Sequence, residues 1–152
     1  MLDRPKKSKV KKMIIELKIV LASGRHFDGE WEANIQLDES ATLEDLHCAI
    51  QRAVRFDNDH SYSFFTSRNL RGSSREYYHH DEEEIERTLS EIFPLPPKKS
   101  FFYLFDWGDE WIFKISRSRK RPHEPEPRVT YPRVVKKLGT KPKQYPSFDD
   151  DC

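Results

Sequence analysis

The chain has 152 residues, the ordinary length of one domain, and its hydrophobic content of 36% is enough for one core. A charged fraction of 35% and ten prolines favour solvated ends around a core of roughly 100 residues. No apolar run reaches the ~18 residues of a membrane span, and Glu16 and Lys18 interrupt the segment Met13–Ala22, so neither a membrane partner nor a signal peptide is expected.

The two cysteines, Cys48 and Cys152, cannot build a zinc site or a disulfide framework, which favours a reducing, cytoplasmic location. The net charge of +1 hides a segregation along the chain: residues 1–12 and 117–143 are basic, whereas residues 76–92 are acidic. Basic ends serve either as solvating tails, the favoured interpretation, or as phosphate-binding segments. The residues that would bind nucleic acid are Lys6, Lys7, Lys9, Lys11, Lys12, Arg117, Arg119, Lys120 and Arg121.

The first part of the chain predicts a hairpin followed by a helix. Alternating apolar residues indicate strands over Met13–Ala22 and Trp31–Leu37, which we expect to pair in antiparallel fashion. Thr42 and Asp45 are spaced as in a capping box and predict the start of a helix that ends near Arg55. Its expected buried face consists of Leu43, Leu46, Ile50, Ala53 and Val54.

The middle of the chain predicts a strand over residues 61–66 and a polar loop over residues 67–80. A second helix is expected over residues 81–93, because its acidic first turn suits the helix dipole and three prolines follow it. The apolar stripe of this helix is Ile85, Leu89, Ile92 and Phe93.

Residues 100–116 are the most β-like segment, with two strands joined by the turn Asp106-Trp107-Gly108-Asp109. Gly108 is expected to supply the positive φ of that turn. A charged linker follows over residues 117–128, and residues 129–135 are a candidate edge strand.

These elements predict one α+β domain, with a mixed or antiparallel sheet of five to six strands and two helices packed on one face. The expected organisation is a disordered basic tail over residues 1–12, the domain over residues 13–135, and a polar C-terminal tail over residues 136–152.

The sequence lacks a glycine-rich phosphate loop, a nucleophile elbow and paired Cys or His at metal-ligand spacing, so no metal site and no cofactor are expected. His47 lies at the edge of the buried helix face, and we interpret it as a core histidine bonded to backbone rather than as a catalytic residue. Cys48 points away from that face and has no neighbour that would lower its pKa, as expected of an ordinary thiol.

Two clusters of acidic residues could carry chemistry. Asp57 and His60 follow the first helix and fit either an acid/base pair or a helix-ending turn. In a two-residue turn Asp106 and Asp109 would face each other, and a bulge, a basic partner or a cation would have to offset their repulsion. The candidate binding site consists of Asp57, His60, Asp106, Asp109 and Glu110. If the protein is an enzyme, the candidate catalytic residues are the same set without Glu110.

The aromatic residues of the last two strands could stack nucleic-acid bases. The charges interleaved with them are mainly acidic, however, so core packing is the favoured use. These residues are Phe101, Phe102, Tyr103, Phe105, Trp107, Trp111 and Phe113.

Five segments, in order over roughly residues 14–135, resemble the plasmid pRiA4b open-reading-frame-three family. They are Ile15-Glu16-Leu17-Lys18-Ile19, Thr42-Leu43-Glu44-Asp45-Leu46-His47, Phe56-Asp57-Asn58-Asp59-His60, Tyr103-Leu104-Phe105-Asp106-Trp107-Gly108-Asp109-Glu110-Trp111 and Tyr131-Pro132-Arg133. The chain departs from the family pattern at Glu32, where the family has arginine, and at Phe113, where it has histidine. Lys141-Pro142-Lys143 occupies the region of the family's cysteine-containing tail.

The resemblance implies no settled activity, and the family's association with plasmids and mobile elements favours a DNA-related accessory role by analogy. The preferred function is therefore a non-enzymatic binding or accessory domain that holds a protein partner or a cation at the acidic hairpin and helix exit. Nucleic-acid binding through the basic tails is the first alternative. A hydrolase-like enzyme using Asp57, His60, Asp106 and Asp109 is the second.

Overall fold

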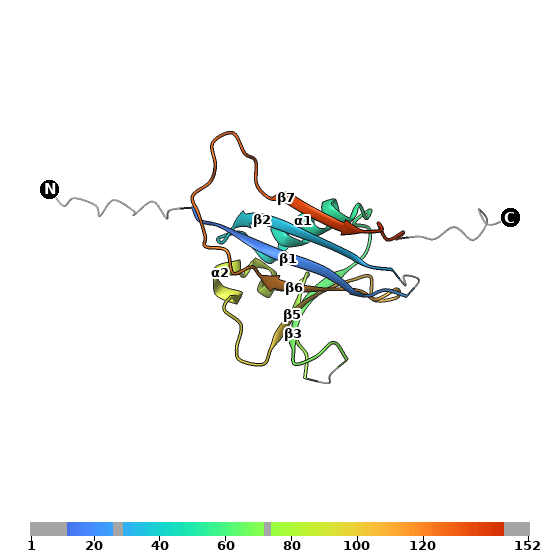
Figure 1. Cartoon of the computed structure of the whole chain (residues 1–152). Helices are drawn as coiled ribbons and strands as arrows, with labels where there is room; N and C mark the ends of the chain where they lie inside the picture. The colour runs from blue at the N-terminus through green and yellow to red at the C-terminus, as the bar shows by residue number, and fades with distance from the viewer. Residues whose placement is uncertain (1–11, 26–28, 72–73, 145–152) are drawn as a thin grey trace.

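A computed structural model describes residues 12–25, 29–71 and 74–144 (Figure 1). Within them, seven strands form one antiparallel sheet in the order β4-β3-β5-β6-β1-β2-β7. The elements are β1 (Ile14–Ser23), β2 (Trp31–Asp38), α1 (Leu43–Val54), β3 (Tyr62–Ser67), β4 (Glu76–His79), the 3₁₀ helix η1 (Glu83–Glu86), α2 (Leu89–Ile92), β5 (Ser100–Phe105), β6 (Trp111–Arg117) and β7 (Arg133–Gly139). The α+β class is confirmed, whereas the expected five to six strands are too few. In the described part of the chain, no helix is long and apolar enough to cross a membrane.

Helix α1 forms where the local sequence predicts it. The Thr42 side chain accepts from the Asp45 amide at 3.2 Å, and the Asp45 carboxylate accepts from the Thr42 amide at 2.9 Å, which completes the capping box. Arg55 ends the helix in the left-handed region, with φ of 59°. All five residues expected on its buried face are buried.

The expected second helix over residues 81–93 is wrong, because the chain forms η1 and the short α2 with a break at Thr88. Thr88 is extended, with φ of −87° and ψ of 160°. The backbone on either side bonds the segment before α1 instead of continuing a helix: the Leu43 amide donates to the Arg87 carbonyl and the Leu89 amide to the Ala41 carbonyl. Tertiary pairing therefore overrides the helical pattern.

Two edge strands depart from the prediction. Strand β4 lies in the expected polar loop over residues 67–80, and it pairs with β3 alone. Strand β7 begins four residues later than the expected strand over residues 129–135 and continues to Gly139, beyond the expected end of the domain. Since almost all of its side chains are exposed, β7 has no apolar periodicity to reveal it. The predicted tail over residues 1–12 lies almost wholly outside the described residues, as does the end of the chain.

The hairpin loop is longer than predicted. The last β5–β6 pair is Phe105 with Trp111, so the loop comprises residues 106–110. Asp106 and Glu110 adopt the positive φ values, 63° and 49°, and Gly108 does not. Asp106 and Asp109 therefore do not face each other in a ladder.

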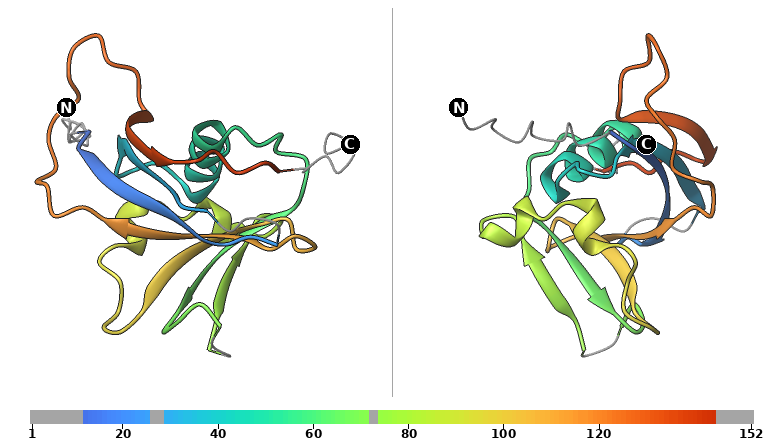
Figure 2. Two further views of the ribbon diagram at one scale, coloured as in Figure 1. Left: turned by 45° about the vertical axis from the view of Figure 1, so that its right-hand side comes forward. Right: turned by 90° about the vertical axis from the view of Figure 1, so that its left-hand side faces the viewer.

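The sheet curves around α1 and α2 (Figure 2). Alternate strand residues point to opposite faces, and those on the inner face join the buried side chains of both helices in one hydrophobic cluster. We call the opposite side the outer face. Its strand residues include Tyr77 and His79 on β4, Ser63, Phe65 and Ser67 on β3, Ser100, Phe102 and Leu104 on β5, Ile112, Lys114 and Ser116 on β6, Ile14, Glu16, Lys18 and Val20 on β1, Glu32, Asn34, Gln36 and Asp38 on β2, and Arg133, Lys136 and Leu138 on β7.

Candidate functional site

The helix exit and the hairpin meet at His60 and Asp106. The His60 Nε2 atom lies 3.4 Å from Asp106 Oδ2 and 3.7 Å from Asp59 Oδ1. Asp106 is only 7% exposed, and its Oδ1 atom accepts from the amides of Gly108 at 3.0 Å and Asp109 at 3.3 Å. Both carboxylate oxygens of Asp106 therefore have partners, and the contact with His60 fastens the hairpin loop to the segment that follows α1.

The other predicted members of this cluster lie apart from that contact. Asp57 is exposed, and its backbone amide donates to Gln144 Oε1 at 2.6 Å. Asp109 lies beside Arg25, with 4.0 Å between Oδ1 and Nη1, and Glu110 is exposed. Among the residues the structure describes, no group of three or more His, Cys, Asp or Glu side chains could hold a metal ion.

Gln144, in the predicted polar tail, contacts the segment that follows α1. No pattern in the sequence indicated this contact. Its side chain is buried and donates to Asp59 Oδ1 at 2.8 Å, in addition to accepting from the Asp57 amide. The segment after β7 is thereby fastened to the end of α1.

His47 is the centre of a buried polar network. Its Nε2 atom lies 2.6 Å from Asn58 Oδ1, which can only accept, so Nε2 carries the proton. Its Nδ1 atom then accepts from the Tyr103 hydroxyl at 2.5 Å, and that hydroxyl oxygen accepts from Gln51 Nε2 at 2.9 Å. The His47 ring also stacks on Tyr62, with 3.5 Å between ring centroids. The expectation of a backbone partner for His47 is wrong, because its partners are side chains.

Burial sets the protonation states of this network. It lowers the pKa of His47 to about 4 and raises that of Tyr62 to about 12. The pKa of Tyr103 is likewise raised well above its ordinary value by burial. At neutral pH the network is uncharged, and both ring nitrogens of His47 are hydrogen-bonded within it. The network therefore serves folding rather than proton transfer. The helical spacing of His47 and Gln51 could have indicated this pair, whereas Tyr103 and Asn58 are brought to it by the fold.

Cys48 lies on the opposite side of α1, half-buried. Burial and the neighbouring Glu44 carboxylate raise the pKa of its thiol. This agrees with the interpretation of an unreactive thiol.

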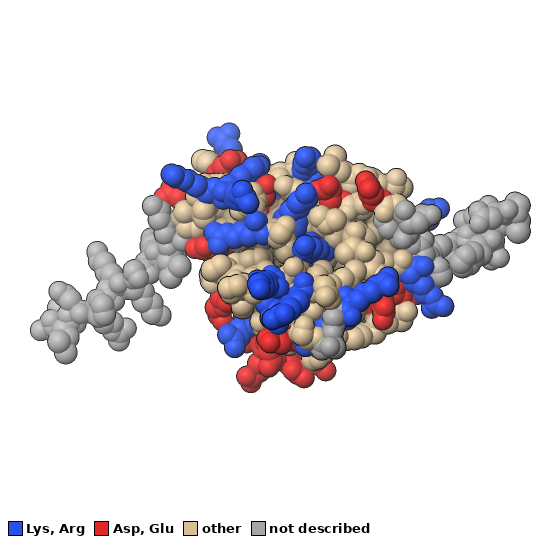
Figure 3. Space-filling model, turned by 60° about the horizontal axis from the view of Figure 1, so that its bottom comes forward, with Lys and Arg blue, Asp and Glu red and all other residues tan. Residues whose placement is uncertain are grey.

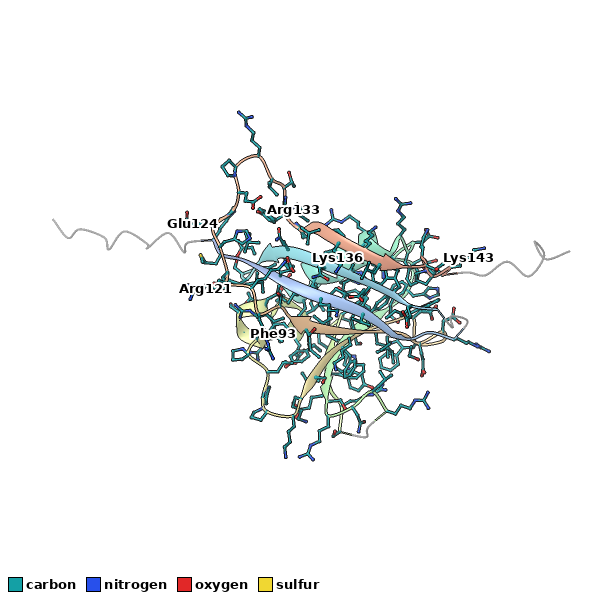
Figure 4. The ribbon with its side chains drawn as sticks, viewed as in Figure 1. Phe93, Arg121, Glu124, Arg133, Lys136 and Lys143 are labelled. Atoms are coloured by element: carbon teal, nitrogen blue, oxygen red, sulfur yellow. The ribbon has the colours of Figure 1, made fainter. Side chains whose placement is uncertain are left out.

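The outer face of the sheet carries lysines that the tail-based prediction overlooked. Lys18, Lys114 and Lys136 come from β1, β6 and β7, and all three side chains are exposed. Register places Lys18 and Lys136 on either side of Asn34, and Lys114 opposite Val20. Figure 3 shows Lys and Arg side chains gathered across this face, and Figure 4 shows Arg133 and Lys136 along β7. Alternation within each strand is the sequence signal that could have found these lysines.

The carboxylates of the outer face are already engaged. Glu16 is buried and accepts from Asn34 Nδ2 at 3.0 Å and Gln36 Nε2 at 3.2 Å. Lys120 Nζ lies 3.1 Å from the same carboxylate. Burial raises the pKa of Glu16, but the hydrogen bonds from Asn34, Lys120 and Gln36 outweigh it and the pKa lies below its ordinary value.

Glu32 lies 3.4 Å from Lys18 Nζ and so neutralises one of the lysines. Within the described residues, neither Lys114 nor Lys136 forms an ion pair with a carboxylate. The outer face of β6, β1, β2 and β7 therefore presents uncompensated positive charge.

The described members of the predicted nucleic-acid set lie at the end of β6, on the loop that follows it and just before β1. Arg117 ends β6 and, with Lys99 and Lys114, borders an apolar hollow of about 420 Å³ that Phe93 also lines. Lys120 bonds Glu16, as described above, and Arg119 and Arg121 are exposed on the same loop. Lys12 is exposed and precedes β1. Lys6, Lys7, Lys9 and Lys11 lie outside the described residues.

Comparison with known proteins identifies relatives of the whole fold. The family model described as "Plasmid pRiA4b ORF-3-like protein" matches residues 14–144. A crystal structure of a protein of unknown function from Methanosarcina mazei Go1 is similar, with a TM-score of 0.64 and 22% sequence identity over 84% of this chain and 70% of that chain. That level of identity shows a shared fold. No curated protein matches the chain.

Proposed function

The chain belongs to the plasmid pRiA4b ORF-3-like protein family, and from that premise we propose that it is a non-enzymatic accessory domain that binds nucleic-acid phosphates on the outer face of its sheet. The observation that carries the proposal is the unequal pairing of charge on this face. Glu16 and Glu32 are bonded to lysine and Asp38, at the end of β2, accepts from Ser40, while Lys114 and Lys136 are exposed and form no ion pair in the described structure.

The spacing of the lysines suits a polyanion. Neighbouring strands lie about 4.8 Å apart, so Lys114 on β6 and Lys136 on β7 are separated by roughly 14 Å across the sheet. Nucleic acids present closely spaced phosphates along such a length, and each neutralised phosphate releases condensed counterions. A polyanion can therefore contact several of these lysines at once, and the binding is expected to weaken steeply with salt.

The two histidine clusters support a role in binding rather than in catalysis. His47 is neutral, buried and saturated with hydrogen bonds, and His60 contacts an Asp106 whose other oxygen is occupied by amides. Binding of a protein or a cation at the acidic hairpin is the weaker proposal, since Asp106 and Asp109 are already engaged within the fold.

Lys136 and Lys137 offer a matched test, because they are neighbours on the exposed strand β7 and point to opposite faces. Lys136 pairs with Asn34 on the outer face, and Lys137 pairs with Ala33 on the inner face. We expect K136E to weaken binding of a labelled oligonucleotide, measured by fluorescence anisotropy, and to reduce the slope of log affinity against log salt by about 1 or more.

The K137E control carries the same change in net charge and is expected to bind nearly as the native chain does. Equal losses in the two variants would indicate an unspecific effect of net charge. Absence of binding even at about 50 mM salt would rule out the proposal.

A further inference from the structure

An exposed aromatic cluster lies on the outer face at the opposite end of the sheet from β7. Trp107 of the hairpin is 43% exposed, and its ring centroid lies 5.6 Å from that of Tyr77 and 6.3 Å from that of His79. Tyr77 and His79, two residues apart on β4, are themselves stacked, with 5.0 Å between centroids and 9° between planes. Three rings from two distant segments of the chain thus form one surface.

Hydrogen bonds hold the cluster in place. The Tyr77 hydroxyl accepts from Arg75 Nη1 at 3.2 Å, and His79 Nδ1 lies 2.8 Å from Ser63 Oγ. Arg75 is fixed in turn, because its Nη2 donates to the Leu70 carbonyl at 2.6 Å and its guanidinium lies 4.3 Å from the centroid of the Phe65 ring. The Tyr77 and His79 rings are therefore held in fixed positions at the surface instead of being buried in the main core.

The aromatic cluster lies on the same side of the sheet as the basic part of the outer face. Strand register places Tyr77, Phe65, Phe102 and Lys114 in one row across β4, β3, β5 and β6. Phe65 and Phe102 are buried, with Leu70 and Tyr77 packed against their cluster. Three strand spacings, roughly 14 Å, thus separate Tyr77 from Lys114. The loop between β3 and β4 adds Arg68, Arg71 and Arg75 and contains no acidic residue.

Two of the three acidic residues in the hairpin loop have partners within the fold, and the third, Glu110, is exposed. Asp106 is buried beneath the loop with its Oδ1 atom bonded to two amides, and Asp109 lies beside Arg25. The basic group bonded within the aromatic cluster is Arg75, which donates to the hydroxyl of the Tyr77 that Trp107 contacts.

Resting on the proposed function, we infer that the nucleic acid bound on this face is single-stranded and that one or more of its bases stack on Trp107 and Tyr77. In a duplex the faces of the bases are covered by their neighbours, so the protein can contact phosphates, sugars and base edges but cannot stack on a base. An unpaired strand offers both phosphates to the lysines and ring faces to the aromatic cluster. Sequence-tolerant single-strand binders combine these two features.

The test compares a labelled oligothymidylate of about 12 nucleotides with a duplex of the same length, using the full chain. Stacking of one base contributes about 1–3 kcal/mol, which corresponds to a loss of roughly 5-fold to 150-fold in affinity. W107A is expected to weaken single-strand binding within this range and to leave duplex binding unchanged within about 2-fold, while W107F restores most of the loss.

Tyr77 and Tyr78 provide the matched control. They are neighbours on β4, and Tyr77 pairs with Phe65 on the outer face whereas Tyr78 pairs with Phe64 on the inner face. Y77L is expected to lose single-strand affinity, and Y78L, folded as judged by circular dichroism, is expected to keep it.

The outcomes separate this inference from the proposed function. If W107A and Y77L bind the single strand as tightly as the native chain, or lose affinity equally for both probes, the stacking inference is overturned while salt-dependent phosphate binding stands. If the native chain binds neither probe at low salt, both proposals fail.

Discussion

Acid is expected to destabilise the protein through one residue, His47. Its Nε2 proton is donated to Asn58, and its Nδ1 atom accepts from the Tyr103 hydroxyl. A proton added at Nδ1 would oppose the hydroxyl proton and place a charge in a buried site. To accept from a protonated Nδ1, the Tyr103 hydroxyl, which also accepts from Gln51, would have to turn its hydrogen away from His47.

The size of the effect follows from the lowered pKa. Burial lowers the pKa of His47 from 6.5 to about 4, so the unfolded chain binds more protons than the folded chain between these two values. The contribution to stability is complete above pH 6.5 and decreases as the pH falls through this window. A difference of about 2.5 pH units corresponds to roughly 3 kcal/mol of unfolding free energy.

The assay is urea denaturation of the native chain and H47Q at several pH values between about 7 and 4. Glutamine does not titrate, and the other ionisable groups are common to both proteins, so the difference in unfolding free energy isolates His47. We expect the advantage of the native chain to shrink by about 3 kcal/mol across the window. An advantage that stays constant with pH would refute the reasoning. If H47Q does not fold, NMR titration of the His47 ring in the native chain measures the same pKa, and a value near 6.5 would contradict the account.

Two further predictions concern the folding of local elements. T42A removes half of the capping box and is expected to cost about 1 kcal/mol in thermal or urea unfolding, with T42S close to native. D106A leaves the amides of Gly108 and Asp109 without their acceptor and places alanine at a positive φ, so a loss of about 1–3 kcal/mol is expected. D106N keeps an acceptor and tolerates that φ, and a loss as large as that of D106A would show that the charge, rather than the acceptor, matters.

Local signals predicted the elements that depend on them. Helix α1 was predictable because its cap, its apolar stripe and its end at Arg55 all lie within one segment. The region after β4 was not, because Thr88 is held extended by the chain before α1, a contact between residues far apart in sequence. Strand β7 was misplaced for a related reason: it is exposed on both sides and its position is set by pairing with β2.

The candidate site shows the same division. Strand alternation could have placed Lys18 and Lys114 on one face. The register of the six strand pairs was needed to show which lysines lie beside a carboxylate on that face. The expected face-to-face contact of Asp106 and Asp109 was wrong because the loop is longer than two residues. The contact of the Trp107 ring with the Tyr77 ring joins the hairpin to a strand that has no apolar periodicity, so the sequence contained no signal for it.

The most direct test of phosphate binding on the outer face is to map amide chemical shifts of the labelled protein as a duplex oligonucleotide, which cannot stack on Trp107, is added at low salt. The account predicts that the perturbed amides cluster on β6, β1, β2 and β7 around Lys18, Lys114 and Lys136, and that they return to their free positions as salt rises. Perturbations confined to the exposed side of α1 or to the acidic hairpin loop would contradict it.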